Sequence, residues 1–201
     1  MLSEQVILLC PGQGAQKVGM GKAWHDVSTA AKAIFDEADE VLGDTLGRPL
    51  SEICFTDPDG KLNQTNVSQP AIYTTSIASL YGLREQGFEE EIIATAGLSL
   101  GEYSALHLAG VFSFADGLRL VTKRGQLMQE AAEAAQTAAK AKEVADDAEK
   151  AREAAEEKAL AAVAVAEETE QVAVEAEQTA AEAKELADDA EKERVEAEQV
   201  A

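Results

Sequence analysis

The chain has 201 residues, of which 38 are acidic and 17 basic, and its formal net charge is −21. Nucleic acids and anionic membrane surfaces repel so acidic a chain, which excludes both as expected partners. The length allows one ordinary domain, or one small domain and an appendage.

Cysteine usage and hydropathy indicate the compartment. Cys10 and Cys54 lack the spacing of a metal site or a disulfide framework, so we expect no metal and a reducing environment. The apolar run over residues 6–10 is too short for the core of a signal peptide, and no later run reaches membrane-spanning length. The sequence therefore predicts a cytoplasmic protein.

The first predicted element is a strand. Residues 6–10 form a continuous apolar run of the kind found in strands buried on both faces. The run ends at the loop Pro11-Gly12-Gln13-Gly14-Ala15-Gln16, where two glycines allow the backbone to approach another group closely. This segment alone leaves a plain turn and a binding loop open, and the amides of Gln13 and Gln16, which no turn requires, favour the binding loop.

Helices are predicted next. Residues 18–42 form an amphipathic pattern that ends at Gly43. We interpret His25, within this helix, as a surface or half-buried residue. The apolar face of the helix consists of Trp24, Val27, Ala31, Ile34, Phe35, Ala38 and Leu42.

Between this helix and the next strand, residues 50–55 predict a short helix or a connector, followed by a turn at residues 57–60. Residues 71–80 predict a longer helix with Pro70 in its first turn and Gly87 after its end.

Gly97-Leu98-Ser99-Leu100-Gly101 has the form of a nucleophile elbow, in which a strand enters a helix through a turn too tight for bulky neighbours. Such a pentapeptide also occurs in structural turns, but the β-prone run before it (residues 92–96) and the helical pattern after it (102–109) favour the nucleophile. The elbow would expose the Ser99 hydroxyl and offer the Leu100 N–H to a developing oxyanion. The residues expected to face inward are Leu100, Ala105, Leu108 and Ala109.

Ser113 is predicted to cap a further helix over residues 116–129, which carries Arg119, Lys123 and Arg124. Strands and helices thus alternate over residues 1–126. This alternation favours an α/β fold with a parallel sheet.

Residues 127–201 have a different composition. They contain no glycine, proline, cysteine or aromatic residue, and carry 22 acidic and 8 basic residues. Steps of three and four residues from Ala131 reach 21 positions, of which 18 are alanine, so a 3.5-residue period predicts a long helix. A segment over residues 142–150 recurs 42 residues later. A second, apolar stripe consists of Val144, Val165, Val172, Leu186 and Val200.

The alanine seam leaves the role of this helix open. A multi-chain or antiparallel coiled coil and a lone, charge-stabilised helix are both compatible with it, because alanine buries little area. The helix is accordingly either a spacer or self-association arm, or a low-complexity tract without a partner.

Four motifs, in this order and spacing, resemble the malonyl-CoA:acyl-carrier-protein transacylases of fatty acid biosynthesis. The resemblance covers about residues 5–130. The motifs are Pro11-Gly12-Gln13-Gly14-Ala15-Gln16, Ser68-Gln69-Pro70-Ala71, Gly97-Leu98-Ser99-Leu100-Gly101-Glu102-Tyr103-Ser104-Ala105-Leu106 and Arg124-Gly125-Gln126-Leu127-Met128-Gln129.

The resemblance implies a role for each matching residue. Ser99 would be the nucleophile, and the backbone amides of Gln13 and Leu100 would form the oxyanion hole. Arg124 would bind the free malonyl carboxylate, for which a guanidinium offers two parallel donors. The resemblance also implies a hydrolase-like acyltransferase core without a bound cofactor. Its substrates would be malonyl-CoA and acyl carrier protein bearing phosphopantetheine.

Two departures from the family pattern matter. Leu98 stands where many relatives have histidine, and the family's catalytic histidine comes from a later strand, beyond an inserted subdomain that we do not find here. His107 follows Ser99 on the same predicted helix, about 12 Å further along its axis, and cannot reach the serine hydroxyl.

We therefore expect an incomplete parallel-sheet acyltransferase core over residues 1–126, followed by a heptad helix over 127–201. We expect this chain alone to be incomplete or inactive in malonyl transfer. One alternative is a catalytically inactive remnant that acts through its coiled coil as an oligomerisation or interaction protein. Another is a fragment in which the helix precedes the remaining half of the enzyme.

Overall fold

The structure is a computed structural model that describes the backbone of residues 5–200 and the side chains of residues 5–185. The chain divides into two units, residues 1–137 and 138–201. The division falls inside the last helix, downstream of the 126/127 boundary expected from composition. The two units are described separately below.

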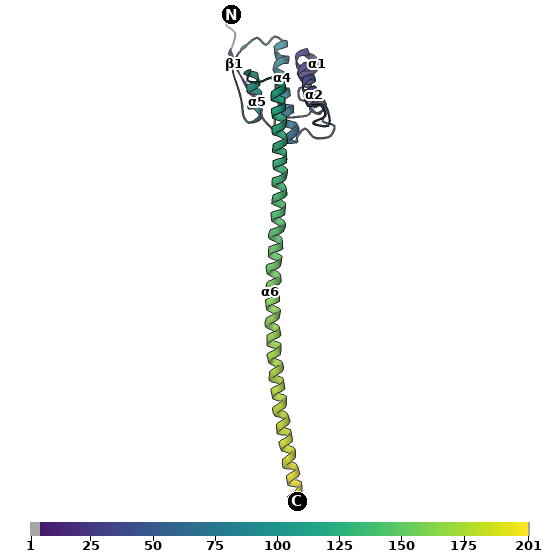
Figure 1. Cartoon of the computed structure of the whole chain (residues 1–201), viewed down its shortest axis with the longest axis vertical. Coiled ribbons are helices and arrows are strands. Elements are labelled where there is room, and N and C mark those ends of the chain that lie inside the picture. Colours follow the sequence, from purple (N-terminus) through teal and green to yellow (C-terminus); the bar gives the residue numbers. More distant parts are fainter. Residues whose placement is uncertain (1–4, 201) are drawn as a thin grey trace. The chain divides into compact units, whose positions relative to one another are not determined.

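The first unit is a mixed α/β structure, as predicted. Over the residues described from Gln5 onward, two strands pair in parallel, and most of the helices lie between them in the chain. The elements, most of which are labelled in Figure 1, are β1 (Gln5–Cys10), α1 (Lys22–Val27), α2 (Thr29–Leu42), α3 (Leu50–Thr56), α4 (Thr65–Glu85), β2 (Glu91–Gly97), α5 (Leu100–Leu108) and the first part of α6 (Phe114–Val200).

The sheet is packed on one face only. Thr95 on β2 donates its hydroxyl proton to the Ala105 carbonyl of α5 at 2.8 Å, which places α5 against the strand. On β1, Ile7 and Leu9 are 57% and 80% exposed. The prediction that residues 6–10 are buried on both faces is therefore wrong, because no described element covers the face that carries these two side chains.

The core lies mainly between α2 and α4 and includes the first part of α6. Apolar side chains at helical spacing supply its interior. Residues with no more than 1% exposure include Ala31, Phe35, Ala38, Leu50, Ile53, Ile72, Tyr73, Ile77, Leu118 and Val121.

The helix predicted over residues 18–42 is two helices. Ser28 between them has an extended backbone (φ −127°, ψ 124°), and its Oγ accepts a hydrogen bond from the Ala31 amide at 3.0 Å, which starts α2 afresh. The break leaves Val27 66% exposed, so its assignment to the buried face was wrong. Gly43 ends α2 as predicted. His25 is half-buried against the rings of Phe35 and Phe55, also as predicted.

Helix α4 begins earlier than predicted. Its first residue is Thr65, so Pro70 lies inside the helix and the prediction that it occupies the first turn was wrong. Contacts with α6 hold these extra residues, since the Gln129 Oε1 accepts the Thr65 amide at 3.2 Å. A Cβ on Gly125 would lie 2.9 Å from the Thr65 carbonyl oxygen, so a glycine lets α6 approach this end of α4 closely.

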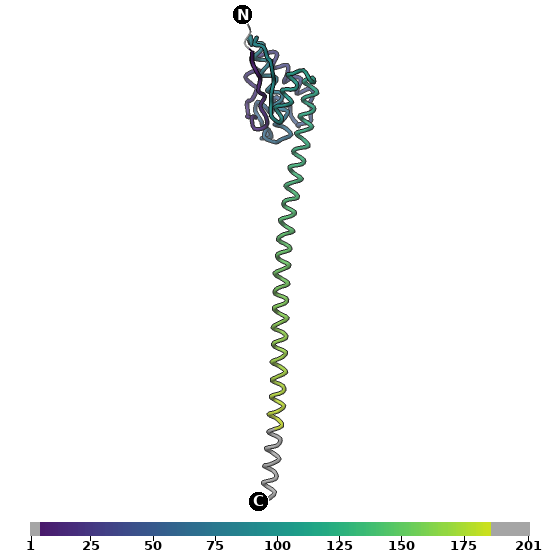
Figure 2. Tube along the Cα trace, turned by 90° about the vertical axis from the view of Figure 1, so that its left-hand side faces the viewer, coloured from purple at the N-terminus to yellow at the C-terminus, as the bar shows by residue number. Residues whose placement is uncertain are grey.

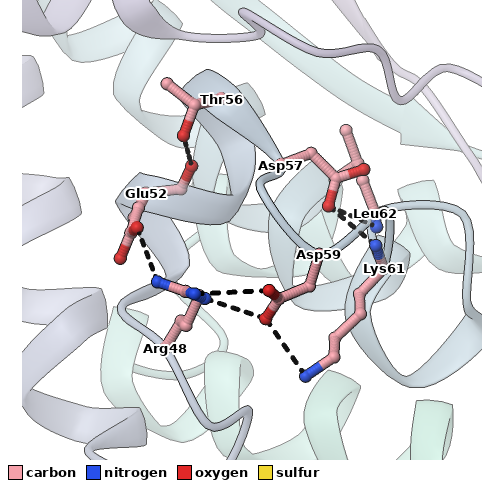
Figure 3. Close-up of polar contacts among 7 residues, drawn as sticks. All are labelled: Arg48, Glu52, Thr56, Asp57, Asp59, Lys61 and Leu62. Carbon is pink, nitrogen blue, oxygen red and sulfur yellow. Dashed lines mark hydrogen bonds and ion pairs between the residues drawn. The ribbon is translucent and has the colours of Figure 1, made fainter.

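A polar cluster fixes the loop between α3 and α4 (Figure 3). Arg48 donates to Asp59 at 2.8 and 3.2 Å and to Glu52 at 2.9 Å. The hydrogen bond from Arg48 lowers the pKa of Asp59 below its usual range. Asp57, whose φ is +43°, accepts the amides of Lys61 and Leu62 at 2.7 and 3.1 Å. The cluster therefore anchors the segment that enters α4.

Helix α6 starts with the predicted cap. The Ser113 Oγ accepts the Asp116 amide at 3.1 Å. The helix does not end near Gln129 as predicted but continues to Val200, because no glycine or proline follows Gly125 to stop it.

The second unit is an uninterrupted helical trace over its described residues (Figure 2), as predicted for the heptad segment. Its side chains are exposed from residue 138 to residue 185, and Val144, Val165 and Val172 are 60–70% exposed. The seam positions beyond residue 185 lie outside the described side chains. In the described part of the chain, no helix has both the length and the apolar character to cross a bilayer.

Candidate active site

The predicted elbow is present. Strand β2 ends at Gly97 and helix α5 begins at Leu100. Between them the exposed Ser99 adopts φ 57° and ψ −108°, a conformation that side-chain-bearing residues rarely adopt. Strain of this kind is typical of a nucleophile held at the entrance of a helix.

Both elbow glycines are required by packing. A Cβ on Gly97 would lie 2.1 Å from the carbonyl carbon of Gly101, and a Cβ on Gly101 would lie 2.2 Å from the carbonyl oxygen of Cys10. Real Cβ atoms do not approach backbone atoms so closely, so neither position admits alanine without movement. The glycines thus bring β1, β2 and α5 together beneath Ser99.

Of the four helix residues expected to face inward, Leu100 and Ala105 are buried and Leu108 is half-buried, whereas Ala109 is exposed and that assignment was wrong. Ala109 follows the last helical residue and forms its C-cap, so it lies beyond the face that packs on the sheet.

Arg124 on α6 places its guanidinium beside Ser99. The Arg124 Nη2 donates to the Ser99 Oγ at 2.9 Å, and its Nη1 donates to the Gln69 Oε1 at 2.6 Å. The guanidinium carbon also lies 5.7 Å from the centre of the Tyr103 ring, a cation–π distance. Residues from α4, α5 and α6 therefore meet at the elbow.

Sequence reasoning did not single out Gln69 or Tyr103. Both lie inside the motifs that carry the family resemblance, and Gln69 is an amide among the buried residues of α4. An amide amid apolar residues is the one local signal that would have indicated it, since buried polar groups require a partner.

The predicted oxyanion-hole residues belong to two segments that meet beside Ser99. Leu100 is the buried first residue of α5. In the loop after β1, a Cβ on Gly12 would lie 3.0 Å from the Leu98 carbonyl oxygen, so this loop touches the elbow. The Gln13 side chain donates to the Thr65 hydroxyl oxygen at 3.2 Å, which links the loop to α4.

Gln16 stabilises the same loop rather than reaching the elbow. Its Oε1 accepts the Gly14 amide at 2.8 Å and its Nε2 donates to the Asn63 Oδ1 at 3.1 Å. The two side-chain amides noted in the sequence therefore hold the loop in place.

Neither histidine serves Ser99 in this arrangement. His107 lies at the opposite end of α5, where its Nδ1 is 3.0 Å from the Phe112 carbonyl oxygen. His25 lies on α1 beside Asp26 and contacts two phenylalanine rings. The structure thus agrees with the expectation that His107 cannot reach the serine.

The cysteines do not compete with Ser99 as nucleophiles. Burial raises the pKa of the Cys54 thiol to about 12 and also raises that of Cys10, so both remain protonated near neutral pH. Over the described residues, no group of three or more His, Cys, Asp or Glu side chains is arranged to hold a metal ion.

Comparison with known proteins gives the family. The acyl transferase domain model matches residues 7–201. The malonyl CoA-acyl carrier protein transacylase of Bacillus subtilis is 46% identical over 134 residues, which are 67% of this chain and 40% of that protein. The polyketide biosynthesis transacylase PksC of the same species is 40% identical over 129 residues, or 64% of this chain and 42% of that protein.

Solved structures of malonyl transacylases are also similar to this chain. The malonyl CoA-acyl carrier protein transacylase of Clostridium perfringens superimposes with a TM-score of 0.56 at 46% identity, covering 64% of this chain and 39% of that one. A malonyl-transacylase in complex with its type II polyketide acyl carrier protein also gives 0.56, at 40% identity over 64% of this chain and 40% of that one. The chain thus spans less than half the length of these relatives, and by its match to the domain model it belongs to the acyl transferase family.

Proposed function

We propose that this chain contributes the nucleophile and the carboxylate-binding residue of a malonyl transferase. Malonyl-CoA would be the donor, and the phosphopantetheine thiol of an acyl carrier protein the acceptor, in fatty acid biosynthesis. The names of the relatives support the reaction, and the contact between Arg124 and Ser99 is the observation that carries it.

The chemistry proceeds in two transfers. The Ser99 Oγ attacks the thioester carbonyl of malonyl-CoA, the C–S bond breaks and the CoA thiolate leaves. The thiol of the carrier then loses its proton and attacks the new ester, whose C–O bond breaks, and the Ser99 Oγ regains a proton. In both steps the backbone amides of Gln13 and Leu100 would donate to the oxyanion, aided by the N-terminus of α5.

Arg124 provides the selectivity for malonyl. Its guanidinium lies beside the nucleophile, and among the described residues no carboxylate lies within ion-pair distance of it. A malonyl group offers a carboxylate two bonds from the reacting carbonyl, whereas an acetyl group offers none. The arginine would therefore favour a malonyl ester on Ser99 over an acetyl ester.

A base is needed to take the Ser99 proton, and both histidines of the chain are engaged elsewhere. We therefore expect this chain alone to malonylate slowly and to be accelerated by imidazole in solution, which can accept that proton. The test is intact-mass measurement of the chain with malonyl-CoA, with and without imidazole. Adduct that forms equally in Ser99→Ala, or none with imidazole present, would contradict the proposal.

A second candidate is self-association through the helical unit, favoured by its exposed apolar side chains at Val144, Val165 and Val172. If two copies pair along the alanine seam, Ala173→Asp should abolish a concentration-dependent dimer in sedimentation. Gln171→Asp adds the same charge away from the seam and should not. A chain that stays monomeric, or a dimer that survives Ala173→Asp, would contradict this candidate.

A further inference from the structure

Gln69 holds Arg124 from the interior of α4. Its side chain is fully buried, and both amide atoms have partners on α6. The Oε1 accepts from the Arg124 Nη1 at 2.6 Å, and the Nε2 donates to the Met128 Sδ at 3.3 Å. Arg124 and Met128 are one helical turn apart, so a single amide ties α4 to the turn of α6 that faces the elbow.

The orientation of this amide follows from its partner. A guanidinium has five N–H donors and no acceptor, so only the carbonyl oxygen of the amide can face it. The reversed amide would set two donors against each other. Each terminal nitrogen of Arg124 retains a second N–H beyond those given to Gln69 and Ser99, and these remain available to a carboxylate.

The acceptor is neutral, which distinguishes Arg124 from Arg48 and Arg119. Arg48 is paired with Glu52 and Asp59, and Arg119 with Asp116. Arg124 is held instead by the uncharged amide carbonyl of Gln69. A carboxylate at position 69 would make a stronger hydrogen bond and would also cancel the charge that an incoming acyl carboxylate needs.

We infer that Gln69 is a specificity-determining positioning residue: it fixes the Arg124 guanidinium beside Ser99 while leaving its positive charge uncompensated for a carboxylated acyl group. This inference rests on the proposed function. It assigns the discrimination between malonyl and acetyl donors to a pair of residues, of which only Arg124 touches the substrate.

Two substitutions at position 69 separate this role from a structural one. Gln69→Glu keeps an acceptor for Arg124 but adds a negative charge, whereas Gln69→Met removes the acceptor and adds no charge. A residue needed only to hold Arg124 should tolerate Glu better than Met. If the neutrality of the acceptor matters, Gln69→Glu should instead lower the ratio of malonyl-CoA to acetyl-CoA affinity more than Gln69→Met does.

The experiment measures binding of malonyl-CoA and of acetyl-CoA to the full chain by calorimetry. Gln69→Glu should lower the malonyl preference by at least about tenfold, and more than Gln69→Met does. Gln136→Glu, which adds the same charge at an exposed site on α6, should leave the preference unchanged. Circular dichroism establishes that each variant is folded.

The outcomes separate the two proposals. A wild-type chain with no malonyl preference would overturn the proposed function, and this inference with it. A wild-type preference that Gln69→Glu retains would overturn the inference alone. If Gln69→Glu does not fold, Gln69→Met decides: it should weaken malonyl-CoA binding several-fold and leave acetyl-CoA binding unchanged, and an equal loss for both ligands would overturn the inference.

Discussion

The two units are both rich in helix, yet they are stabilised differently. In the first unit, large side chains such as Phe35, Tyr73 and Leu118 are fully buried. In the second, the side chains described are all exposed, including Leu160 at 68%. Alanine-rich sequence makes a helix through backbone propensity alone, whereas a site needs elements that burial holds against each other. Only the first unit therefore builds a candidate active site.

Two leucines on the same helix test this difference most strongly. Leu118→Ala should destabilise the first unit by about 3 kcal/mol, because it leaves a cavity in the core. Leu160→Ala should change the stability of the chain by less than about 0.5 kcal/mol, since its side chain packs against nothing described. Urea unfolding followed by Trp24 fluorescence measures the first unit, and equal effects of the two substitutions would contradict the comparison.

The elbow should be the next most sensitive position. Gly101→Ala should cost about 2 kcal/mol, because the added Cβ meets the Cys10 carbonyl. Gly43→Ala is the control: it places a Cβ in open space, at a position whose φ of +48° disfavours a side chain, and should cost about 1 kcal/mol. Chemical denaturation measures the free energy of unfolding of both variants. If Gly101→Ala lowers it no more than Gly43→Ala does, the result would argue against the close packing beneath Ser99.

The cap of α6 should have a smaller effect. Ser113→Ala removes the acceptor of the Asp116 amide and should destabilise the first unit by about 1 kcal/mol. Ser113→Asp keeps an acceptor at the cap and should retain most of the stability. Thermal melts of the three proteins test this, and an unchanged melting temperature for Ser113→Ala would mean that the cap does not stabilise the helix.

Acid should destabilise the first unit and increase the helicity of the second. Hydrogen bonds from Arg48 and Lys22 lower the pKa of Asp59 and Asp26 in the folded first unit. The contribution of these two carboxylates to the stability of the fold is fully present above their ordinary pKa of 3.8. It is lost as the pH falls through the lower pKa that they have in the folded unit. In the heptad segment, with 22 acidic and 8 basic residues, acid removes repulsion and should increase helicity.

Two optical signals follow this response separately. Trp24 is the only tryptophan and reports on the first unit, while far-UV circular dichroism is dominated by the long helix. Below about pH 4 the fluorescence should indicate loosening while helicity holds or rises. A parallel loss of both signals would show that acid acts on the two units alike.

The structural features that the sequence predicts best are those set by residues close to each other in the chain. The elbow follows from two glycines that flank Ser99, and the start of α6 follows from the Ser113 cap. The break at Ser28 was missed because apolar periodicity runs through it, although its side chain supplies the cap that starts a new helix.

Features set by distant residues were not predictable in the same way. The contact of Gln69 with Arg124 joins positions 55 residues apart and depends on how α4 and α6 pack. The apolar run of β1 indicates that packing another element on each face of the strand would be favourable. It does not show whether such an element is present, so the exposure of Leu9 could not be predicted. The meeting of Arg124 with Ser99 was anticipated only through the family resemblance.

The most direct test of the central claim, that Ser99 and Arg124 form a malonyl-selective site, is a competition between donors. The chain is incubated with equal malonyl-CoA and acetyl-CoA in the presence of imidazole, and the acyl group on the peptide containing Ser99 is identified by mass spectrometry. The account predicts mostly malonyl ester in the wild-type chain and loss of that preference in Arg124→Ala. An acetyl ester in equal amount, or a malonyl preference that survives Arg124→Ala, would contradict it.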